Sequence, residues 1–336
     1  MVRPDVENST RMNRPPIRIA KVFDDPLAIR ALVERHGPYR AMTGYLPVSP
    51  MRIGTAVHAE AGVLPWFRGT WARDGKPLVD GVEAILENQH LREAASRLFD
   101  TTNVIPNTVA VNVNAPMPAG AIHVDIPSFL GATRDRYPIH LLQAMGSSGL
   151  FESWRILEAG VVVWFYEGLG GAYDYWPSGL DGPMLRELPP LTNRALAADS
   201  DRMYHRIGWI GDPAPITPAI TRDSQIQHIA GGAWVITDGD RTIQTYSDEQ
   251  IRISILWKGR VGPAVGSDDH EETPLTLERI VQVFMRDLNS RGIEPPTPES
   301  PLPDQMWLNL VHSTYCARVE PLGESRESVD VLLPRS

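Results

Sequence analysis

Cysteine is almost absent from this sequence, since Cys316 is the one cysteine among 336 residues. A single thiol excludes an internal disulfide framework, a cysteine-rich zinc site and an iron–sulfur cluster, because each of these needs several cysteines. Few cysteines are typical of proteins that work in a reducing compartment. The sequence therefore predicts a cytoplasmic protein.

Long apolar runs are also missing. No stretch approaches the roughly 20 consecutive apolar residues that span a bilayer, and residues 1–20 lack the apolar centre of a signal peptide. We therefore expect no membrane segment, and we expect the N-terminus to be a flexible lead-in.

Clustered positive charge is scarce as well. The chain has a formal net charge of −9, and its basic residues are scattered. Binding to nucleic-acid phosphates needs a concentrated basic surface, so no nucleic-acid partner is expected. The glycine-rich nucleotide-binding motifs and the G-x-S-x-G nucleophile motif are absent too.

What the chain does contain is a series of short β-type segments between residues 105 and 260. Turn residues separate alternating or apolar runs such as NTVAVNVNAPM, AIHVDIPSF, GVVVWFYEG, MYHRIGWIG and IRISILWKG. About eight short strands with flanking helices indicate a double-stranded β-helix, the jelly-roll or cupin architecture. The predicted fold class is mainly β with flanking helices.

Helical spacing of apolar residues marks several segments around these strands. The predicted helices cover 24–37, 82–99, the first part of 138–156 and the run that Thr276 caps, while 176–192 is predicted to be a loop. We divide the chain into a helical and irregular extension, a catalytic core, and a C-terminal helix and tail, as one structural domain overall. Their bounds are 1–104, 105–260 and 261–336.

The segment AIHVDIPSF carries the first chemical signal. On a strand, His123 and Asp125 project from the same face because side chains alternate with period two. His205 follows 80 residues after Asp125, in another strand-like run. Two histidines and one carboxylate on one face of an octahedron leave three positions open, which is diagnostic of non-haem ferrous oxygenases. These three residues are therefore the predicted iron ligands.

Arg252 and Ser254 form a second same-face pair, in IRISILWKG. An arginine can hold a carboxylate through two hydrogen bonds, and a neighbouring hydroxyl can add one more. This is the chemistry that would anchor the distal carboxylate of 2-oxoglutarate.

With these motifs in order, residues 105–260 resemble the iron(II)- and 2-oxoglutarate-dependent dioxygenase superfamily. The resemblance implies that His123, Asp125 and His205 bind Fe(II), that Arg252 and Ser254 hold 2-oxoglutarate as cosubstrate, and that O2 is consumed. It implies hydroxylation, desaturation or cyclisation of a small organic substrate. Halogenating relatives lack the carboxylate ligand, so Asp125 argues against halogenation.

One spacing departs from that family. Its arginine usually follows the distal histidine at a much shorter distance than the 47 residues that separate His205 from Arg252. An insertion over 212–232 and an extra hairpin over 233–247 would account for the difference. Arg206 and Arg222 remain alternatives: Arg206 points to the opposite face of its strand, and Arg222 lies in a predicted loop.

Further candidates surround the iron ligands. Asn112 and Asn114 share a strand face and are predicted to contact the cosubstrate. Aromatic residues and one arginine are predicted to line or close the substrate pocket, three of them on a mobile Gly-rich loop, with core packing as the alternative role of the aromatics. These pocket candidates are Trp164, Tyr166, Tyr173, Tyr175, Trp176 and Arg134.

Two other functions stay open at this stage. The first is a barrel-fold non-haem iron dioxygenase or oxidase that does not use 2-oxoglutarate. The second is a non-catalytic jelly-roll binding protein whose histidines are incidental. Zinc hydrolysis is disfavoured because no general base accompanies the three ligands, and the acidic run at 268–272 is read as a solvated loop.

Overall fold

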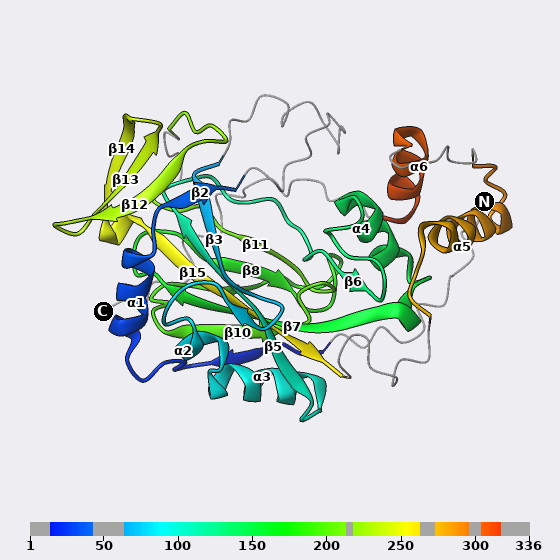
Figure 1. The fold of residues 1–336 in the computed structure, drawn as a ribbon, viewed down its shortest axis with the longest axis horizontal. Helices are drawn as coiled ribbons and strands as arrows, with labels where there is room; N and C mark the ends of the chain where they lie inside the picture. The colour runs from blue at the N-terminus through cyan, green and yellow to red at the C-terminus, as the bar shows by residue number, and fades with distance from the viewer. Residues whose placement is uncertain (1–13, 43–63, 213–217, 263–272, 296–303, 317–336) are drawn as a thin grey trace.

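The computed structural model describes residues 14–42, 64–212, 218–262, 273–295 and 304–316 (Figure 1). Most of the N-terminal lead-in, most of the Pro-rich linker before residue 304 and the acidic run at 268–272 lie outside these ranges. Among the described residues, no helix combines the length and the apolar character that a bilayer crossing requires.

A large antiparallel sheet forms the centre of the molecule. Its path starts at β1 (Ile17–Ile19) and runs through β10 (Arg194–Ala198), β7 (Arg155–Phe165), β15 (Arg252–Val261), β5 (Val104–Asn114), β3 (Trp66–Arg73), β2 (Tyr39–Ala41), β12 (Gln225–Ile229), β13 (Ala233–Asp238) and β14 (Arg241–Ser247). Two short strands lie off this path: β4 (Lys76–Pro77) pairs with β3, and β6 (Ser128–Phe129) pairs with β7.

A small sheet lies against the inner face of the large one. It contains β11 (Tyr204–Ile207), β8 (Tyr173–Trp176) and β9 (Leu185–Glu187), in that order. The extended segment 117–123 adds to the outer side of β11 through isolated bridges that pair Met117 with Ile210 and His123 with His205. Side chains from both sheets interleave in one apolar cluster that includes Trp164, Leu196, Tyr173 and Tyr175.

The order in which the chain visits the two sheets defines the fold. It starts in the large sheet with β5, crosses to segment 117–123, returns to β7, and crosses again to β8 and β9. It then returns to β10, crosses to β11, and ends in β15 between β5 and β7. Eight segments that alternate in this way form a double-stranded β-helix. The predicted fold class is confirmed.

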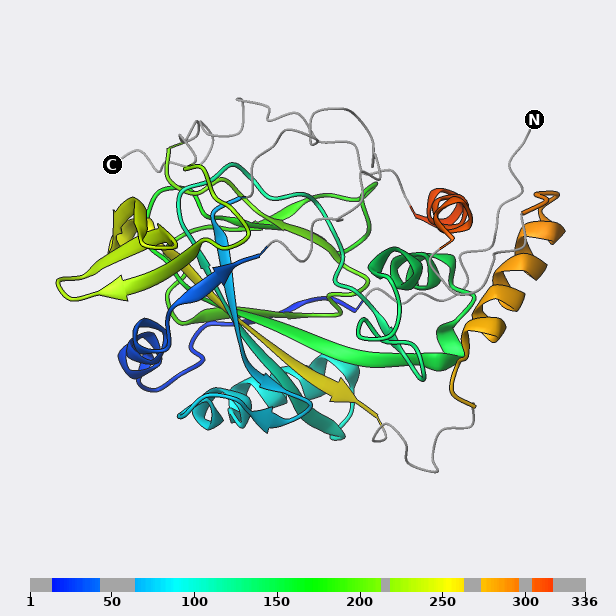
Figure 2. The same cartoon turned by 45° about the horizontal axis from the view of Figure 1, so that its top comes forward.

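Helices cover the outer face of the large sheet (Figure 2). The longest, α3 (Gln89–Phe99), buries Leu91, Ala95 and Leu98 in the main apolar core. Before it come α1 (Pro26–Arg35), which Asp25 caps, and α2 (Glu83–Leu86). The single helix predicted over 82–99 is thus two helices, because Asn88 caps the Leu91 amide and starts α3 anew.

A second apolar cluster lies at the end of the molecule opposite the hairpin β13–β14 (Figure 2). It is built from α4 (Ile139–Ser148), α5 (Leu277–Ser290) and α6 (Gln305–Tyr315), and α6 packs on α4. Thr276 caps α5 as predicted. Two single 3-10 turns, η1 (Glu152–Trp154) and η2 (Asp248–Gln250), complete the described elements. The three-part division of the chain stays a prediction.

Two local predictions are wrong. The strand expected over 121–129 is an extended segment with one bridge at His123, followed by the two-residue β6. Its hydrogen bonds go to two different partners, His205 and Ser200, and Pro127 has no N–H to donate, so no continuous ladder forms. The loop expected over 176–192 contains the strand β9.

Candidate metal centre

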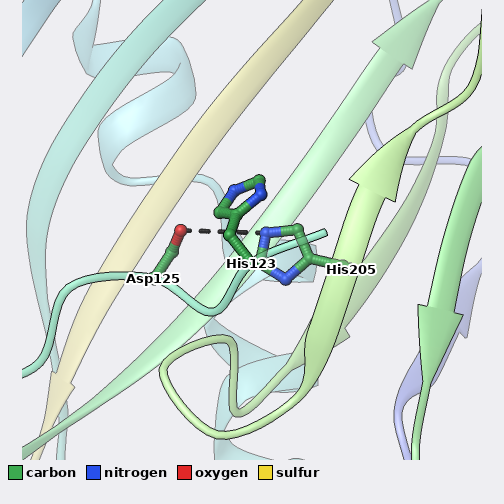
Figure 3. Close-up of side chains that lie close together, drawn as sticks. All are labelled: His123, Asp125 and His205. Atoms are coloured by element: carbon green, nitrogen blue, oxygen red, sulfur yellow. Dashed lines mark ion pairs between the residues drawn. The ribbon is translucent and has the colours of Figure 1, made fainter. Parts of the chain in front are cut away.

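His123, Asp125 and His205 lie side by side between the two sheets (Figure 3). One potential ligand atom from each residue lies within 4.8 Å of those from the other two. The pairing of segment 117–123 with β11 produces this proximity: the backbone N–H of each histidine donates to the carbonyl of the other, at 3.0 and 2.9 Å. The structure thus brings together the three residues that the sequence predicts as iron ligands.

Both histidines are oriented by their own backbone. The Nδ1 atom of His123 lies 2.9 Å from the carbonyl oxygen of Ala121, and the Nδ1 atom of His205 lies 2.9 Å from that of Met203. A carbonyl only accepts, so in each ring Nδ1 carries the proton and Nε2 keeps its lone pair. Both rings are thus oriented so that Nε2 can bind a divalent transition metal.

His205 is also uncharged at neutral pH. Burial lowers the pKa of its imidazole to about 4, and the adjacent His123 ring acts in the same direction. Its Nε2 lies 3.8 Å from Asp125 Oδ1. Because the ring is neutral, this approach is not an ion pair. It places a free nitrogen lone pair next to a free carboxylate oxygen, as a shared metal ion requires.

The other oxygen of Asp125 has two hydrogen-bond donors. Lys258 Nζ lies 2.8 Å from Oδ2, and Ser200 Oγ donates to the same atom over 2.8 Å. Burial alone would raise the pKa of this carboxyl, but the positive charge of Lys258 lowers it well below the usual range. Asp125 is therefore a carboxylate ready to bind a cation. These residues fit a ferrous ion, since two imidazoles and one carboxylate are the facial set of non-haem iron sites.

Arg252 lies at the start of β15 and is only 2% exposed. Its Nε donates to the Gly171 carbonyl over 2.8 Å, whereas its buried terminal nitrogen Nη2 has no hydrogen-bond partner. Burial lowers the pKa of this guanidinium to about 10, and the opposing electrostatic effects come from Tyr166 and Tyr173. Among the described residues, no carboxylate forms an ion pair with Arg252.

Three polar side chains flank Arg252 on the same face of the large sheet. Asn114 is its register partner in β5, and Ser254 faces Asn112 two positions further along. The Oδ1 atom of Asn114 is buried without a hydrogen-bond partner. Asn112, in contrast, already accepts a hydrogen bond from the indole N–H of Trp66 over 3.0 Å. Of the two predicted asparagines, Asn114 is thus the one whose side-chain oxygen lacks a donor.

The predicted aromatic residues have different positions. Tyr173 stacks on His205 with ring centroids 5.5 Å apart, and Trp164 lies 5.3 Å from Tyr173. Tyr175 bonds to Glu187 and Arg18 through its hydroxyl.

The expectation of a mobile loop is wrong for Tyr173, Tyr175 and Trp176. All three are buried in β8, because their alternating faces pack on both sides of the small sheet. Tyr166 donates its hydroxyl to the Leu169 carbonyl over 2.7 Å. Arg134 is exposed on the surface.

The alternative arginines are placed elsewhere. Arg206 Nε donates to Asp174 Oδ2 over 2.9 Å, on the face of the small sheet that points away from His205. Arg222 is exposed and lies outside the strands. The insertion between β11 and β15 includes β12, β13 and β14, which extend the far edge of the large sheet. This insertion accounts for the long gap before Arg252.

Two residues of the site were not predicted. Ser200 follows β10 in a loop whose sequence has no distinctive pattern. Lys258 had a visible signal, because period-two alternation in β15 places it on the same face as Arg252 and Ser254.

Comparison with known proteins assigns no family to this chain. No family model matches the chain, and no curated protein matches it. Among solved structures, an oxidoreductase of the 2OG-Fe(II) oxygenase family from Burkholderia pseudomallei is 13% identical with a TM-score of 0.38, covering 73% of this chain and 84% of that one.

Two prolyl hydroxylases give similar values. A prolyl-4-hydroxylase from Pseudomonas putida is 12% identical with a TM-score of 0.37, covering 74% of this chain and 93% of that one. The viral collagen prolyl hydroxylase of Paramecium bursaria Chlorella virus-1, solved with 2OG, is 11% identical with a TM-score of 0.30, covering 74% and 96%. At these values the likeness assigns neither family nor substrate, so function is argued below from the residues of this chain.

Proposed function

We propose that this protein is an Fe(II) oxygenase that couples oxidative decarboxylation of 2-oxoglutarate to the oxidation of a small organic substrate. The observation that carries the proposal is the buried Arg252, whose Nη2 atom has no hydrogen-bond partner. It accompanies the close approach of His123, Asp125 and His205. An unpaired buried charge is costly, so its retention indicates an anionic ligand that is bound during function.

The iron would be held by the Nε2 atoms of His123 and His205 and by Oδ1 of Asp125. A ferrous ion bound in this way keeps open positions for a chelating cosubstrate and for O2. The carboxylate of Asp125 occupies the position that halide would need, which favours hydroxylation, desaturation or cyclisation over halogenation.

The cosubstrate would lie between the metal and Arg252. 2-Oxoglutarate has a chelating 2-oxo acid at one end and a single carboxylate at the other, so it suits a metal at one end of a pocket and a guanidinium at the other. Tyr173 would border the metal end of this pocket, because its ring stacks on His205 with centroids 5.5 Å apart. Ser254 lies on the same strand face as Arg252, and its hydroxyl would donate a further hydrogen bond at the arginine end.

When bound, the iron and 2-oxoglutarate supply the oxidising chemistry. The chain binds and orients the two, while the apolar residues around Trp164 and Tyr173 keep water away from the reacting atoms. We also propose a small-molecule substrate and a cytoplasmic location. The location is proposed because the chain has a single cysteine.

Arg252→Ala tests this proposal. In anaerobic protein loaded with Fe(II), we expect the affinity for 2-oxoglutarate to fall about 10- to 100-fold, because hydrogen bonds to a charged group are lost. Arg252→Lys should give an intermediate loss, since it keeps the charge but not the two-pronged geometry. Arg222→Ala is the matched control, because that arginine is exposed, and it should bind as the wild type does.

The outcomes separate the alternatives. Stoichiometric iron uptake with no 2-oxoglutarate binding, and with no effect of Arg252→Ala, would point to a barrel dioxygenase or oxidase that does not use this cosubstrate. Absence of iron uptake by the wild-type protein would leave a non-catalytic jelly-roll protein. Release of succinate from 2-oxoglutarate, lost in Arg252→Ala, supports the proposed reaction.

A further inference from the structure

Lys258 lies on the same face of β15 as Arg252, six residues further along the strand. Its side chain is 14% exposed, and its Nζ lies 2.8 Å from Asp125 Oδ2. Burial would lower the pKa of this amine, but the charges of Asp125 and Glu158 raise it above its ordinary value. Lys258 is therefore a charged group held against one chosen oxygen of a metal-binding carboxylate.

Ser200 also contacts Asp125, through both its side chain and its backbone. Its hydroxyl donates to Asp125 Oδ2, and its carbonyl accepts the Asp125 backbone N–H over 2.8 Å. Asp125 is thus fixed at its backbone and at its side chain by one neighbouring residue.

Strand β7 leaves space for the Ser200 side chain at Gly160. Gly160 in β7 is the register partner of both Lys258 and Ala198. A Cβ atom at position 160 would collide with the Ser200 hydroxyl. Position 160 must therefore stay a glycine for Ser200 to reach Asp125, so the contact depends on the packing of the sheet interior.

The two oxygens of Asp125 consequently differ. A carboxylate oxygen has two lone pairs, and both lone pairs of Oδ2 are used by Lys258 and Ser200. Oδ1 accepts no hydrogen bond from these donors and faces His205 Nε2. A metal ion between the histidines therefore meets one free oxygen.

We infer that Lys258 and Ser200 are positioning residues that restrict Asp125 to binding the metal through Oδ1 alone. The inference rests on the proposed function, because it concerns the same iron. If Asp125 bound through both oxygens, it would occupy one of the positions that 2-oxoglutarate and O2 need. The lysine and the serine thus keep the metal open for its cosubstrate.

Cobalt(II) provides the test, because its visible absorption reports coordination number and it does not react with O2 as iron does. The wild type, Lys258→Met, Lys258→Arg and Ser200→Ala are titrated with Co(II), and the loaded proteins are then titrated with 2-oxoglutarate. In Lys258→Met we expect cobalt to bind, the absorption spectrum to change, and the 2-oxoglutarate affinity to fall about tenfold or more. Lys258→Arg should restore both properties, since it keeps a charged donor.

Thermal unfolding identifies variants that do not fold. If Lys258→Met is unfolded, Ser200→Ala carries the test, because it retains the lysine charge and should show the same changes at smaller amplitude. A Lys258→Met or Ser200→Ala protein with the wild-type cobalt spectrum and wild-type 2-oxoglutarate affinity overturns the inference alone. A wild-type protein that takes up no cobalt overturns the proposed function together with the inference.

Discussion

Two groups of histidine and carboxylate residues in this protein have a similar spacing but different surroundings. The first is the candidate metal centre between the sheets. The second consists of Glu34 on α1, His228 on β12 and Asp248 on η2, whose potential ligand atoms also lie within 4.8 Å of one another. By distance alone, the two groups are equivalent.

The second group already contains a cation. Arg30 pairs with Glu34 over 2.9 Å and with Asp248 over 3.0 Å. The indole N–H of Trp234 donates to Asp248 Oδ1, the same oxygen that His228 Nε2 approaches at 3.6 Å. The guanidinium and the indole thus use one oxygen of Glu34 and one oxygen of Asp248, whereas His228 Nε2 has no hydrogen-bond partner.

In the candidate metal centre, the neighbouring cation contacts the carboxylate on the side away from His205. Lys258 Nζ lies 2.8 Å from Oδ2 of Asp125, and the two Nδ1 atoms of the histidines point at backbone carbonyls. Three lone pairs remain free and close together. The two groups therefore differ in where the neighbouring cation lies: Arg30 pairs with both carboxylates of the second group, whereas Lys258 lies against one oxygen of Asp125.

The largest expected effect separates the two groups by metal affinity. His205→Ala removes one of three ligands, so we expect Co(II) or anaerobic Fe(II) affinity to fall by about 100-fold or more. Loss of a residue that only hydrogen-bonds a ligand typically costs less. His228→Ala should leave the affinity and the stoichiometry of one metal per chain unchanged. Equilibrium dialysis measures both, and a loss of metal in His228→Ala would contradict the assignment.

A second prediction concerns stability. A metal present at 100 times its dissociation constant stabilises the folded state by about 2.7 kcal/mol. We expect this gain, measured as a rise in unfolding temperature, in the wild type and in His228→Ala. Asp125→Ala should show none, and a rise of wild-type size in that variant would place the metal elsewhere.

The smallest effect would come from opening the second group. Arg30→Met removes the guanidinium from Glu34 and Asp248 and keeps a side chain of similar length. We expect a second, weak metal site, about 100-fold weaker than the first, because its ligands are half-exposed and the Trp234 indole still occupies Asp248 Oδ1. Calorimetric titration should show two sites in Arg30→Met and one in the double variant Arg30→Met/His228→Ala. A single site in Arg30→Met would mean that the guanidinium is not what excludes metal.

The sequence predicts the local features of this molecule well. Period-two alternation identifies β5, and short apolar or β-rich runs between turn residues identify β7, β13 and β15. It fails for the segment around His123, where the hydrogen bonds go to two partners that lie 75 or more residues away. Such pairing depends on the whole fold and leaves no periodic signal.

The candidate site divides in the same way. His123 and Asp125 share a short motif, and Arg252 and Ser254 share a strand face, so each pair can be found from spacing. Ser200 and the group around Arg30 cannot, because their contacts join segments that only the sheet order brings together. The hypothesis that 2-oxoglutarate meets Arg252 stays a prediction.

One feature of β15 links the two halves of the site. Arg252 and Lys258 are held by a single strand that pairs with β5 on one side and β7 on the other. Six residues of extended chain fix their separation at about 20 Å. Insertion or deletion of one residue between them would turn one of the two cations to the outer face of the sheet. Under the proposed function, this one strand therefore fixes the spacing between the arginine that would hold the cosubstrate and the lysine that contacts Asp125.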